Sequence, residues 1–322
     1  MPRTKPKAQD KYQLITDKLI SLMEQGTLPW QKPWFGNPPR NLIGGNVYQG
    51  SNPLLLTVQM LASEQADPYF IGYHQAKSQG WQVTKGSKAS WIFFAATGTK
   101  EVENEQGEKQ ESRYQIHNWH GVYNIACIDD GDGGRQLQQW KEKYQPTGST
   151  LSEAERVGQA EQFITSSGAR IQHGGDVACY SPASDRINLP DFSAFTSPAA
   201  YYATALHELT HWTGHPNRLN REMKGQFDSQ SYAYEELIAE LGAAFLCNQL
   251  QLTPQTENHA SYLAHWLTLL RKDNRLFLKA SREASKASDF LDYLIGDDDD
   301  NLPPSADEMA GSMPNTMSLR GL

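Results

Sequence analysis

The pentapeptide His207-Glu208-Leu209-Thr210-His211 constrains the fold of this chain more than any other feature. It is an HExxH sequence, and residues four apart lie on one face of an α-helix, so His207 and His211 can bind the same metal ion. Apolar residues with a helical period surround it. We therefore predict a helix that carries two zinc ligands and, in Glu208, the general base of a peptidase. Two helix histidines without any ligand are the alternative.

A third metal ligand has to come from elsewhere, because catalytic zinc takes three protein ligands and leaves one position open. The metzincin class of zinc peptidases places a third histidine in the longer sequence HExxHxxGxxH. Here Gly214 occupies the glycine position, but Asn217 stands where that histidine belongs and His215 falls two residues early. The third ligand is therefore expected on a following helix.

Two downstream glutamates offer the missing ligand. Glu236 and Glu240 lie one turn apart in a helix predicted over about 231–250. Like charges at this spacing repel one another, and a cation near them removes the repulsion. We assign Glu236 as the third ligand and Glu240 as the acceptor for the N–H of a ligand imidazole, which would fix its tautomer. The reverse assignment, and a solvent-facing stripe of glutamates, stay open.

These residues predict hydrolytic chemistry. Zinc lowers the pKa of its bound water to about 7 and polarises a carbonyl, and Glu208 would take the proton and return it to the leaving amine. His215, Tyr232 and Tyr234 are candidates for orienting a substrate, and their spacing does not select one of them.

The composition argues against a secreted or membrane protein. The three cysteines, Cys127, Cys179 and Cys247, are odd in number and widely spaced, unlike a disulfide framework or a cysteine zinc site. No apolar run approaches the roughly 18 residues of a membrane span, and no apolar segment follows the basic N-terminus. We expect a soluble protein of a reducing cytoplasm with no membrane partner.

The chain of 322 residues is long enough for two domains. We expect folded regions over 1–130 and 151–295, a linker over 131–150 that begins in an Asp/Gly-rich run, and a disordered acidic tail over 296–322. Local signals predict helices over about 9–25, 53–65, 152–166, 231–250, 256–279 and 289–295, with a short one near His74 and one that begins at Pro198. Strands are expected over 91–96, 114–128, 169–172, 177–181 and 186–189, with the polar stretch 101–112 as a hairpin loop.

The front of the chain is basic, although the whole chain has a formal net charge of −8. Residues 1–95 hold ten Lys or Arg against five Asp or Glu, a local balance of +5. Aromatic residues are interspersed among these Lys and Arg residues. Such a mixture suits single-stranded nucleic acid, because aromatic rings stack on unpaired nucleobases and basic side chains contact phosphates. The pattern alone favours the alternative of core aromatics with solvated lysines.

Several longer motifs resemble the family of ArdC-type antirestriction proteins. In the front half they are the stretches 26–34, 39–42, 48–52 and 75–86, which are similar to the N-terminal single-stranded-DNA-binding domain of that family. In the second half the stretches 180–187, 207–215 and 234–240 look like its zincin-type metallopeptidase domain. The resemblance spans about residues 9–295. It does not extend to the acidic stretch 101–111 or to the tail.

The resemblance implies an α+β chain of two domains, a small mixed α/β domain that binds single-stranded DNA and a zincin-like metallopeptidase domain similar to SprT-like proteases. It also implies a cytoplasmic bacterial protein of conjugative plasmids, acting in or transferred to the recipient cell, that shields incoming DNA from restriction endonucleases. Zn²⁺ or another divalent ion would be its cofactor. Its partners would be single-stranded DNA, extending to double-stranded DNA, and a protein such as a restriction enzyme or a DNA-bound protein. The expected DNA contacts are Trp30, Lys32, Trp34, Tyr48, Trp81, Lys85 and Lys88.

Two hypotheses follow from this resemblance. In the first, the protein is a DNA-directed metallopeptidase that cleaves a protein such as a restriction enzyme. In the second, it occludes DNA without proteolysis, and its metal site is structural or idle. Replacing Glu208 separates the two, since the change removes the general base and leaves the metal ligands.

Overall fold

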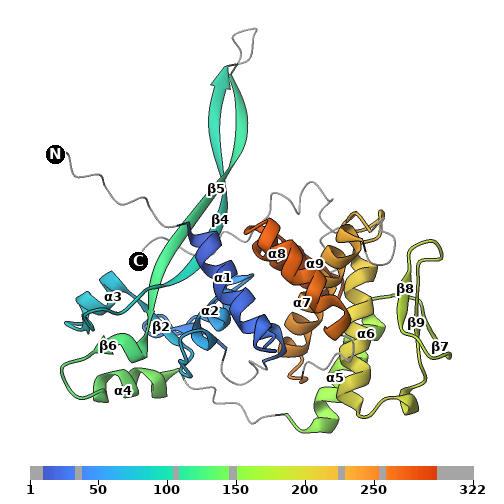
Figure 1. Cartoon of the computed structure of the whole chain (residues 1–322), viewed down its shortest axis with the longest axis horizontal. Coiled ribbons are helices and arrows are strands. Elements are labelled where there is room, and N and C mark those ends of the chain that lie inside the picture. The colour runs from blue at the N-terminus through green and yellow to red at the C-terminus, as the bar shows by residue number, and fades with distance from the viewer. Residues whose placement is uncertain are drawn as a thin grey trace. The chain divides into compact units, whose positions relative to one another are not determined.

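The computed structural model of the protein shows mixed helices and strands, as expected for an α+β chain (Figure 1). None of the helices in its described part has both the length and the apolar composition that a bilayer crossing requires. The predicted tail over 296–322 and the aromatic residue Trp34 lie outside the described residues. The structure describes residues 10–32, 38–103, 109–144, 151–223, 229–253 and 259–295.

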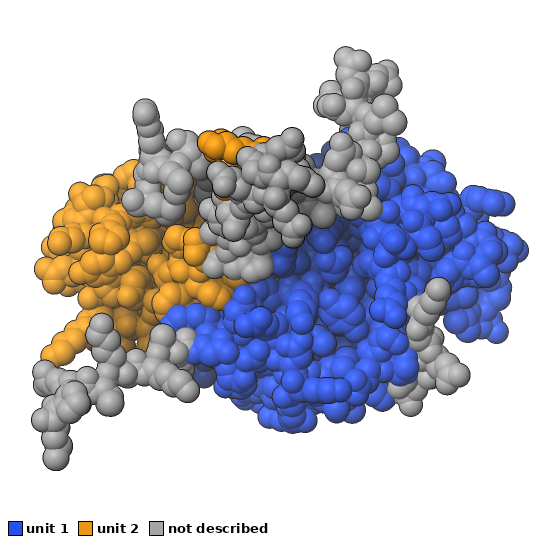
Figure 2. Space-filling view, turned by 90° about the horizontal axis from the view of Figure 1, so that it is seen from above, with its two compact units in different colours: residues 1–38, 57–64, 146–303 blue, residues 39–56, 65–145, 304–322 orange. Residues whose placement is uncertain are grey.

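The chain forms two compact units that do not follow its linear order (Figure 2). Unit 1 contains residues 146–303 together with two earlier segments, 1–38 and 57–64. Unit 2 contains most of the intervening front half, over 39–56 and 65–145. The first helix, which the sequence suggested as part of the front domain, is therefore grouped with the predicted metal-binding helices.

Unit 2 is built on a four-stranded sheet in the order β1-β2-β5-β4. Strand β1 (Arg40–Asn41) runs parallel to β2 (Tyr69–Gly72), and the other neighbours are antiparallel. A second sheet pairs β3 (Gln82–Val83) with β6 (Ile128–Asp129), beside the short helix α3 (Tyr73–Ser78). A cluster of buried side chains unites these elements: Leu42, Tyr69, Ile71, Ala76, Trp81, Ile125, Ile128 and Leu137.

The hairpin of unit 2 is longer than the sequence predicted. Strands β4 (Ser90–Glu103) and β5 (Lys109–Asn124) pair without interruption from Ser90 with Val122 to Glu103 with Lys109. The prediction of a loop over 101–112 is therefore wrong at both of its ends. The stretch 101–112 is polar and has too few apolar residues to show the alternating pattern by which a strand is predicted from sequence.

The predicted linker also contains folded structure. Helix α4 (Arg135–Lys143) lies within it, and its Leu137 joins the buried cluster of unit 2. The helix begins at Arg135, and the carboxylate of the preceding Asp130 accepts hydrogen bonds from the N–H groups of Gly134 at 2.8 Å, Gln136 at 2.9 Å and Leu137 at 3.2 Å. The Asp/Gly-rich run is thus a cap for a helix, and the linker prediction is wrong for 135–143.

Unit 1 is mainly helical, with a small sheet in the order β7-β9-β8. Ser152 and Glu155 form the predicted capping box at the start of the helix Glu153–Ser166. Thr57–Leu61, the second half of α2 (Asn52–Leu61), also belongs to this unit. The other elements are α1 (Lys11–Glu24), the 3-10 helix Pro29–Gln31, α5 (Glu153–Ser166), β7 (Ile171–His173), β8 (Cys179–Ser181), β9 (Arg186–Leu189), the 3-10 helix Phe192–Ala194, α6 (Pro198–Thr213), α7 (Gln230–Gln249), α8 (His259–Lys272) and α9 (Leu276–Ile295).

The helices predicted over 256–279 and 289–295 have different boundaries in the structure. Helix α8 ends at Lys272, and α9 runs without a break from Leu276 to Ile295. Asp273 stabilises the turn between them, since its carboxylate accepts from the N–H of Arg275 at 2.9 Å. Helix α1 holds the same turn, because Thr16 Oγ1 donates to the carbonyl of Asn274 at 2.8 Å.

Candidate metal centre

Helix α6 presents both histidines of the HExxH sequence. Its N-cap is Ser197, whose hydroxyl accepts from the N–H of Ala200 at 3.1 Å, and Pro198 occupies the first turn, where its missing N–H costs nothing. Apolar residues on one side of the helix are buried in unit 1. His207 and His211 lie on an adjoining face with their rings 4.9 Å apart.

Glu236 of α7 faces both imidazoles. Its Oε2 lies 3.5 Å from His207 Nε2, and its Oε1 lies 3.4 Å from His211 Nε2. One donor atom from each of the three residues lies within 4.8 Å of the others. Ligands on a tetrahedral zinc ion are about 3.4 Å apart, because each bond is about 2.1 Å long. Three ligands from two buried helices therefore fit a divalent ion with one position left open.

The electrostatics of this cluster favour a cation. Burial lowers the pKa of both imidazoles, yet hydrogen bonds to carboxylates reverse that effect and raise the pKa of His211 to about 10. Burial would also raise the pKa of Glu236, but hydrogen bonds with the two histidines lower it well below its usual range. The negative carboxylate of Glu236 thus lies between two imidazoles that bind protons strongly. A divalent metal ion can supply the positive charge in place of those protons.

A neighbouring glutamate that the sequence analysis did not select contacts the second histidine. Glu235 Oε1 lies 3.1 Å from His211 Nδ1, the ring nitrogen that faces away from Glu236. Glu240, which we had assigned to this kind of contact, lies 3.8 Å from His207 Nδ1, beyond hydrogen-bonding distance. That Nδ1 is buried and has no hydrogen-bond partner among the described residues. Glu235, Glu236 and Glu240 are close in sequence, and no local signal shows which of them binds the metal and which contacts a histidine.

A close contact between α6 and α7 sets the spacing of the ligands. A Cβ atom on Gly242 would lie 2.5 Å from Thr210 Cγ2 and 2.8 Å from Thr210 Oγ1. Side chains do not tolerate such distances, so the helices approach this closely only because residue 242 is glycine. Thr210 belongs to the HExxH sequence, and this contact therefore controls the separation of the two ligand-bearing helices.

The three candidate ligands open into a cleft of about 430 Å³. Glu208 is buried in its wall, and the edge strand β8 lines one side through Cys179 and Tyr180. Tyr232 and Tyr262 also line the cleft, with their hydroxyl oxygens 3.4 Å apart. Burial raises the pKa of both phenols, which keeps them as hydrogen-bond donors.

The other candidates for substrate contact lie elsewhere. Tyr234 lines a different cavity, together with Lys279 and Arg282. His215 Nδ1 accepts from the N–H of Asn217 at 3.1 Å within the turn that follows α6. Of the tyrosines and the histidine considered from the sequence, only Tyr232 reaches the cleft among the described residues, and Tyr262 was missed because it lies on another helix.

Arg218 joins the end of α6 to the wall of the cleft. Its guanidinium lies 3.8 Å from the centre of the Trp212 ring, and its Nε donates to the Trp212 carbonyl at 2.6 Å. It also donates to both oxygens of Asp185 and, at 3.1 Å, to the hydroxyl of Tyr180. Since Tyr180 belongs to β8, Arg218 positions this strand relative to the ligand helix.

Three of the aromatic residues predicted to contact DNA are buried in the structure. Trp30 is 1% exposed and packs in unit 1 against Trp266, at 5.7 Å between ring centres. Tyr48 is 9% exposed and packs against Phe70. Trp81 is 4% exposed, and its indole N–H donates to Gln136 Oε1 at 3.1 Å. Their rings cannot stack on a base without leaving the core.

The predicted basic contacts are exposed, and one unpredicted aromatic residue accompanies two of them. Lys32, in unit 1, and Lys85 and Lys88, in unit 2, all reach the surface. Tyr73, at the start of α3, is 51% exposed and meets the exposed ring of His74 edge to face at 5.6 Å. Helix α3 packs against β3, and Lys85 lies two residues after the end of β3, so these groups lie on neighbouring segments of unit 2.

Family models match the two parts of the chain separately. A model for the N-terminal domain of the anti-restriction factor ArdC matches residues 9–122. A model for zincin-like metallopeptidases matches residues 158–283, which include every candidate metal ligand.

Solved structures of one protein are similar over almost the whole chain. The metal-free crystal structure of the antirestriction protein ArdC from the R388 plasmid is 37% identical, with a TM-score of 0.67, and the match covers 89% of this chain and 98% of that one. The Mn(II)-bound structure of the same protein is 35% identical, with a TM-score of 0.66, and the match covers 90% and 99% of the two chains.

Curated relatives include proteins of very different length. A DNA primase TraC from Escherichia coli is 36% identical over 87% of this chain, but the match covers only 27% of the primase. This chain therefore corresponds to about a quarter of that relative. The protein y4eC from Sinorhizobium fredii is 31% identical over 90% of this chain and 94% of its own length.

Proposed function

Because the chain belongs to the family of ArdC antirestriction proteins, we propose that it binds single-stranded DNA and protects incoming DNA from restriction endonucleases by means of a zinc-dependent peptidase site. The setting we propose is plasmid conjugation, in the cytoplasm of the recipient. The convergence of His207, His211 and Glu236 beside Glu208 in one cleft carries the proposal, because a structural metal would need neither a general base nor an open cleft.

The residues of the cleft support hydrolysis of a peptide bond. A bound zinc ion supplies Lewis acidity, which polarises a carbonyl group and acidifies water. Glu208 would accept the proton released by the attacking water and pass it to the leaving amine. Tyr232 and Tyr262 would donate hydrogen bonds to the carbonyl oxygen as negative charge develops on it.

The wall formed by β8 suits an extended peptide. This strand pairs with β9 on one side and is the edge of its sheet within the described part of the chain. An extended segment can add to such an edge through backbone hydrogen bonds. The substrate we propose is a protein bound to DNA, such as a restriction enzyme.

For DNA we propose a surface of unit 2 formed by Tyr73, His74, Lys77, Lys85 and Lys88. Tyr73 would stack on a base, and the lysines would contact phosphates. All five residues are exposed, whereas Trp81 and Tyr48 are buried. This surface therefore replaces the aromatic contacts expected from the sequence.

The substitution Glu208→Gln tests the proteolytic part of the proposal. The variant should keep its metal, because the three ligands are unchanged, and should lose protection of DNA together with cleavage of the endonuclease. Both are measured in one incubation with DNA and a restriction endonuclease, by gels of the DNA and of the protein. Full protection by a metal-loaded Glu208→Gln variant would instead establish occlusion without proteolysis.

A further inference from the structure

Arg221 lies where the C-terminal end of α6 meets α7. Its Nε donates to Glu235 Oε2 at 3.1 Å, and one terminal nitrogen donates to Glu235 Oε1 at 2.7 Å, so the pair is bidentate. The same nitrogen donates to the Thr210 carbonyl at 2.7 Å, and the other donates to Thr213 Oγ1 at 2.8 Å. The side chains of Arg221 and Glu235 are only 5% and 7% exposed. Arg221 thus holds Glu235 against the helix that carries the histidines.

Glu235 continues this chain of contacts to the metal centre. Its Oε1 accepts the Nδ1–H of His211 at 3.1 Å, while His211 Nε2 faces Glu236 at 3.4 Å. An imidazole that donates from Nδ1 keeps a lone pair on Nε2, which is the form that binds a metal. A carboxylate in this position fixes both the tautomer and the orientation of a ligand histidine.

We propose that Arg221 and Glu235 are positioning residues that set the metal affinity of His211. This inference rests on the metal site of the proposed function and adds two residues to it. Gly214 belongs to the same arrangement. A Cβ atom there would lie 2.8 Å from a terminal nitrogen of Arg221, so glycine leaves room for the guanidinium.

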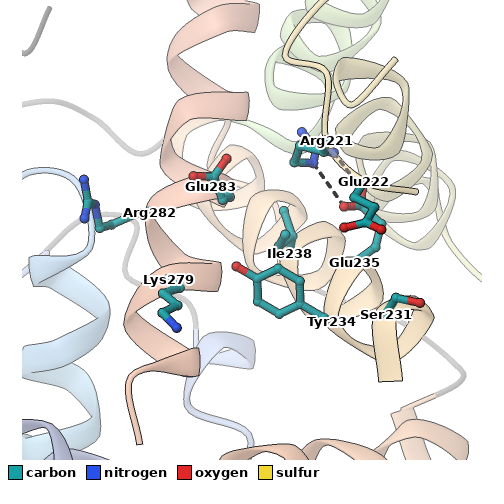
Figure 3. A pocket seen from close by; sticks show the side chains of 9 residues that line it. All are labelled: Arg221, Glu222, Ser231, Tyr234, Glu235, Ile238, Lys279, Arg282 and Glu283. Atoms are coloured by element: carbon teal, nitrogen blue, oxygen red, sulfur yellow. Dashed lines mark hydrogen bonds and ion pairs between the residues drawn. The ribbon is translucent and has the colours of Figure 1, made fainter. Parts of the chain in front are cut away.

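A cavity of about 420 Å³, whose described lining does not include His211, gives access to the pair (Figure 3). Arg221 and Glu235 both line it, and Figure 3 shows them joined by dashed lines, with Lys279 and Arg282 contributed by α9. Glu235 also lines the cleft of the metal centre. The Glu235 carboxylate is therefore part of the lining of both spaces, and we expect a small cation in the cavity to reach it.

This access suggests a test by chemical rescue. Removing the Arg221 side chain in an Arg221→Ala variant enlarges the cavity beside Glu235, and guanidinium ions can occupy the vacated position. Guanidinium carries the charge and the planar donor geometry of the lost group, whereas Na⁺ has the charge without the donors. Glu222 provides a matched control, because it follows Arg221 in sequence and lines the same cavity.

Zn²⁺ affinity of the full chain is measured by competition with a chromophoric chelator, with far-UV circular dichroism as the check on folding. We expect Glu235→Gln and Arg221→Ala to bind Zn²⁺ about 10–100-fold more weakly than wild type, and Glu222→Gln to match wild type. Low millimolar guanidinium chloride should restore affinity in Arg221→Ala, and equal NaCl should not. Wild type should respond to neither salt.

Wild-type affinity in a folded Glu235→Gln variant would overturn the positioning role and leave the metal site intact. Glu235→Gln changes one atom, so it also decides the matter if Arg221→Ala does not fold. Absence of Zn²⁺ binding by wild type would instead overturn the proposed function itself, and this inference with it.

Discussion

The contact between Gly242 and Thr210 leads to a quantitative prediction about Gly242→Ala. The new methyl group would lie 2.5 Å from Thr210 Cγ2, about 0.9 Å closer than carbon atoms normally approach. Thr210 is fully buried, and its hydroxyl donates to the Leu206 carbonyl at 2.8 Å, so it cannot easily turn aside. The two helices must therefore separate.

The expected free-energy change combines two opposing effects. Overpacking of a rigid core costs about 1–3 kcal/mol, and we expect the upper part of that range because backbone and a β-branched side chain meet. Replacing glycine with alanine within a helix recovers about 1 kcal/mol. Gly242→Ala should therefore lower the free energy of unfolding by about 1–2 kcal/mol.

Urea unfolding of the metal-free protein, followed by circular dichroism, measures this difference. Gly158→Ala is the matched control, because Gly158 lies inside α5 with nothing within 4 Å of its added Cβ, and the variant should be more stable by about 0.5–1 kcal/mol. Combining Gly242→Ala with Thr210→Ala removes both close atoms and should make the two changes less than additive. If Gly242→Ala gains as much stability as Gly158→Ala, the close approach of α6 and α7 does not require glycine at position 242, which refutes the prediction.

Three further predictions concern the candidate site and the DNA surface. Glu236→Gln removes the charge of the proposed third ligand and should weaken Zn²⁺ binding by about tenfold or more in chelator competition, whereas unchanged affinity would exclude Glu236 as a ligand. Arg218→Lys cannot keep the paired contacts with Asp185, and it should lower the free energy of unfolding by about 1.5–3 kcal/mol in urea, a result contradicted by a change below 0.5 kcal/mol. Tyr73→Ala should weaken binding of a labelled single strand by about 1–3 kcal/mol in a fluorescence titration, with Phe192→Ala in unit 1 as an exposed aromatic control that leaves binding unchanged.

Local signals allowed much of the helical structure to be predicted. Ser152 and Glu155 mark the start of α5, and Ser197 with Pro198 marks the start of α6, because a cap and its helix are neighbours in sequence. The HExxH sequence is also a local signal, because its two histidines are four residues apart and lie on one face only if the segment is a helix. The α+β class and the family resemblance are confirmed by the structure and by the comparisons.

The errors about individual site residues came from features that depend on contacts distant in sequence. Trp30 belongs to an aromatic and basic stretch, and only its packing on Trp266, far along the chain, shows that it is a core residue. Glu235 and Glu236 are adjacent, so their different roles depend on the approach of α6 and on Arg221 from the following loop. Composition counts such residues but does not show which of them meet solvent.

The assignment of α1 to unit 1 affects how the protein can be divided. A fragment that begins at residue 151 would lack α1 and the 3-10 helix Pro29–Gln31, and it would expose Trp266 and Phe277, which are otherwise buried. Burying two such aromatic side chains contributes about 3–6 kcal/mol, comparable with the whole stability of many domains. A break in the chain between residues 145 and 150 would leave unit 1 assembled from both pieces. The two pieces should therefore behave as complementing fragments that associate through α1 and the 3-10 helix Pro29–Gln31, and neither should be treated as an independent module.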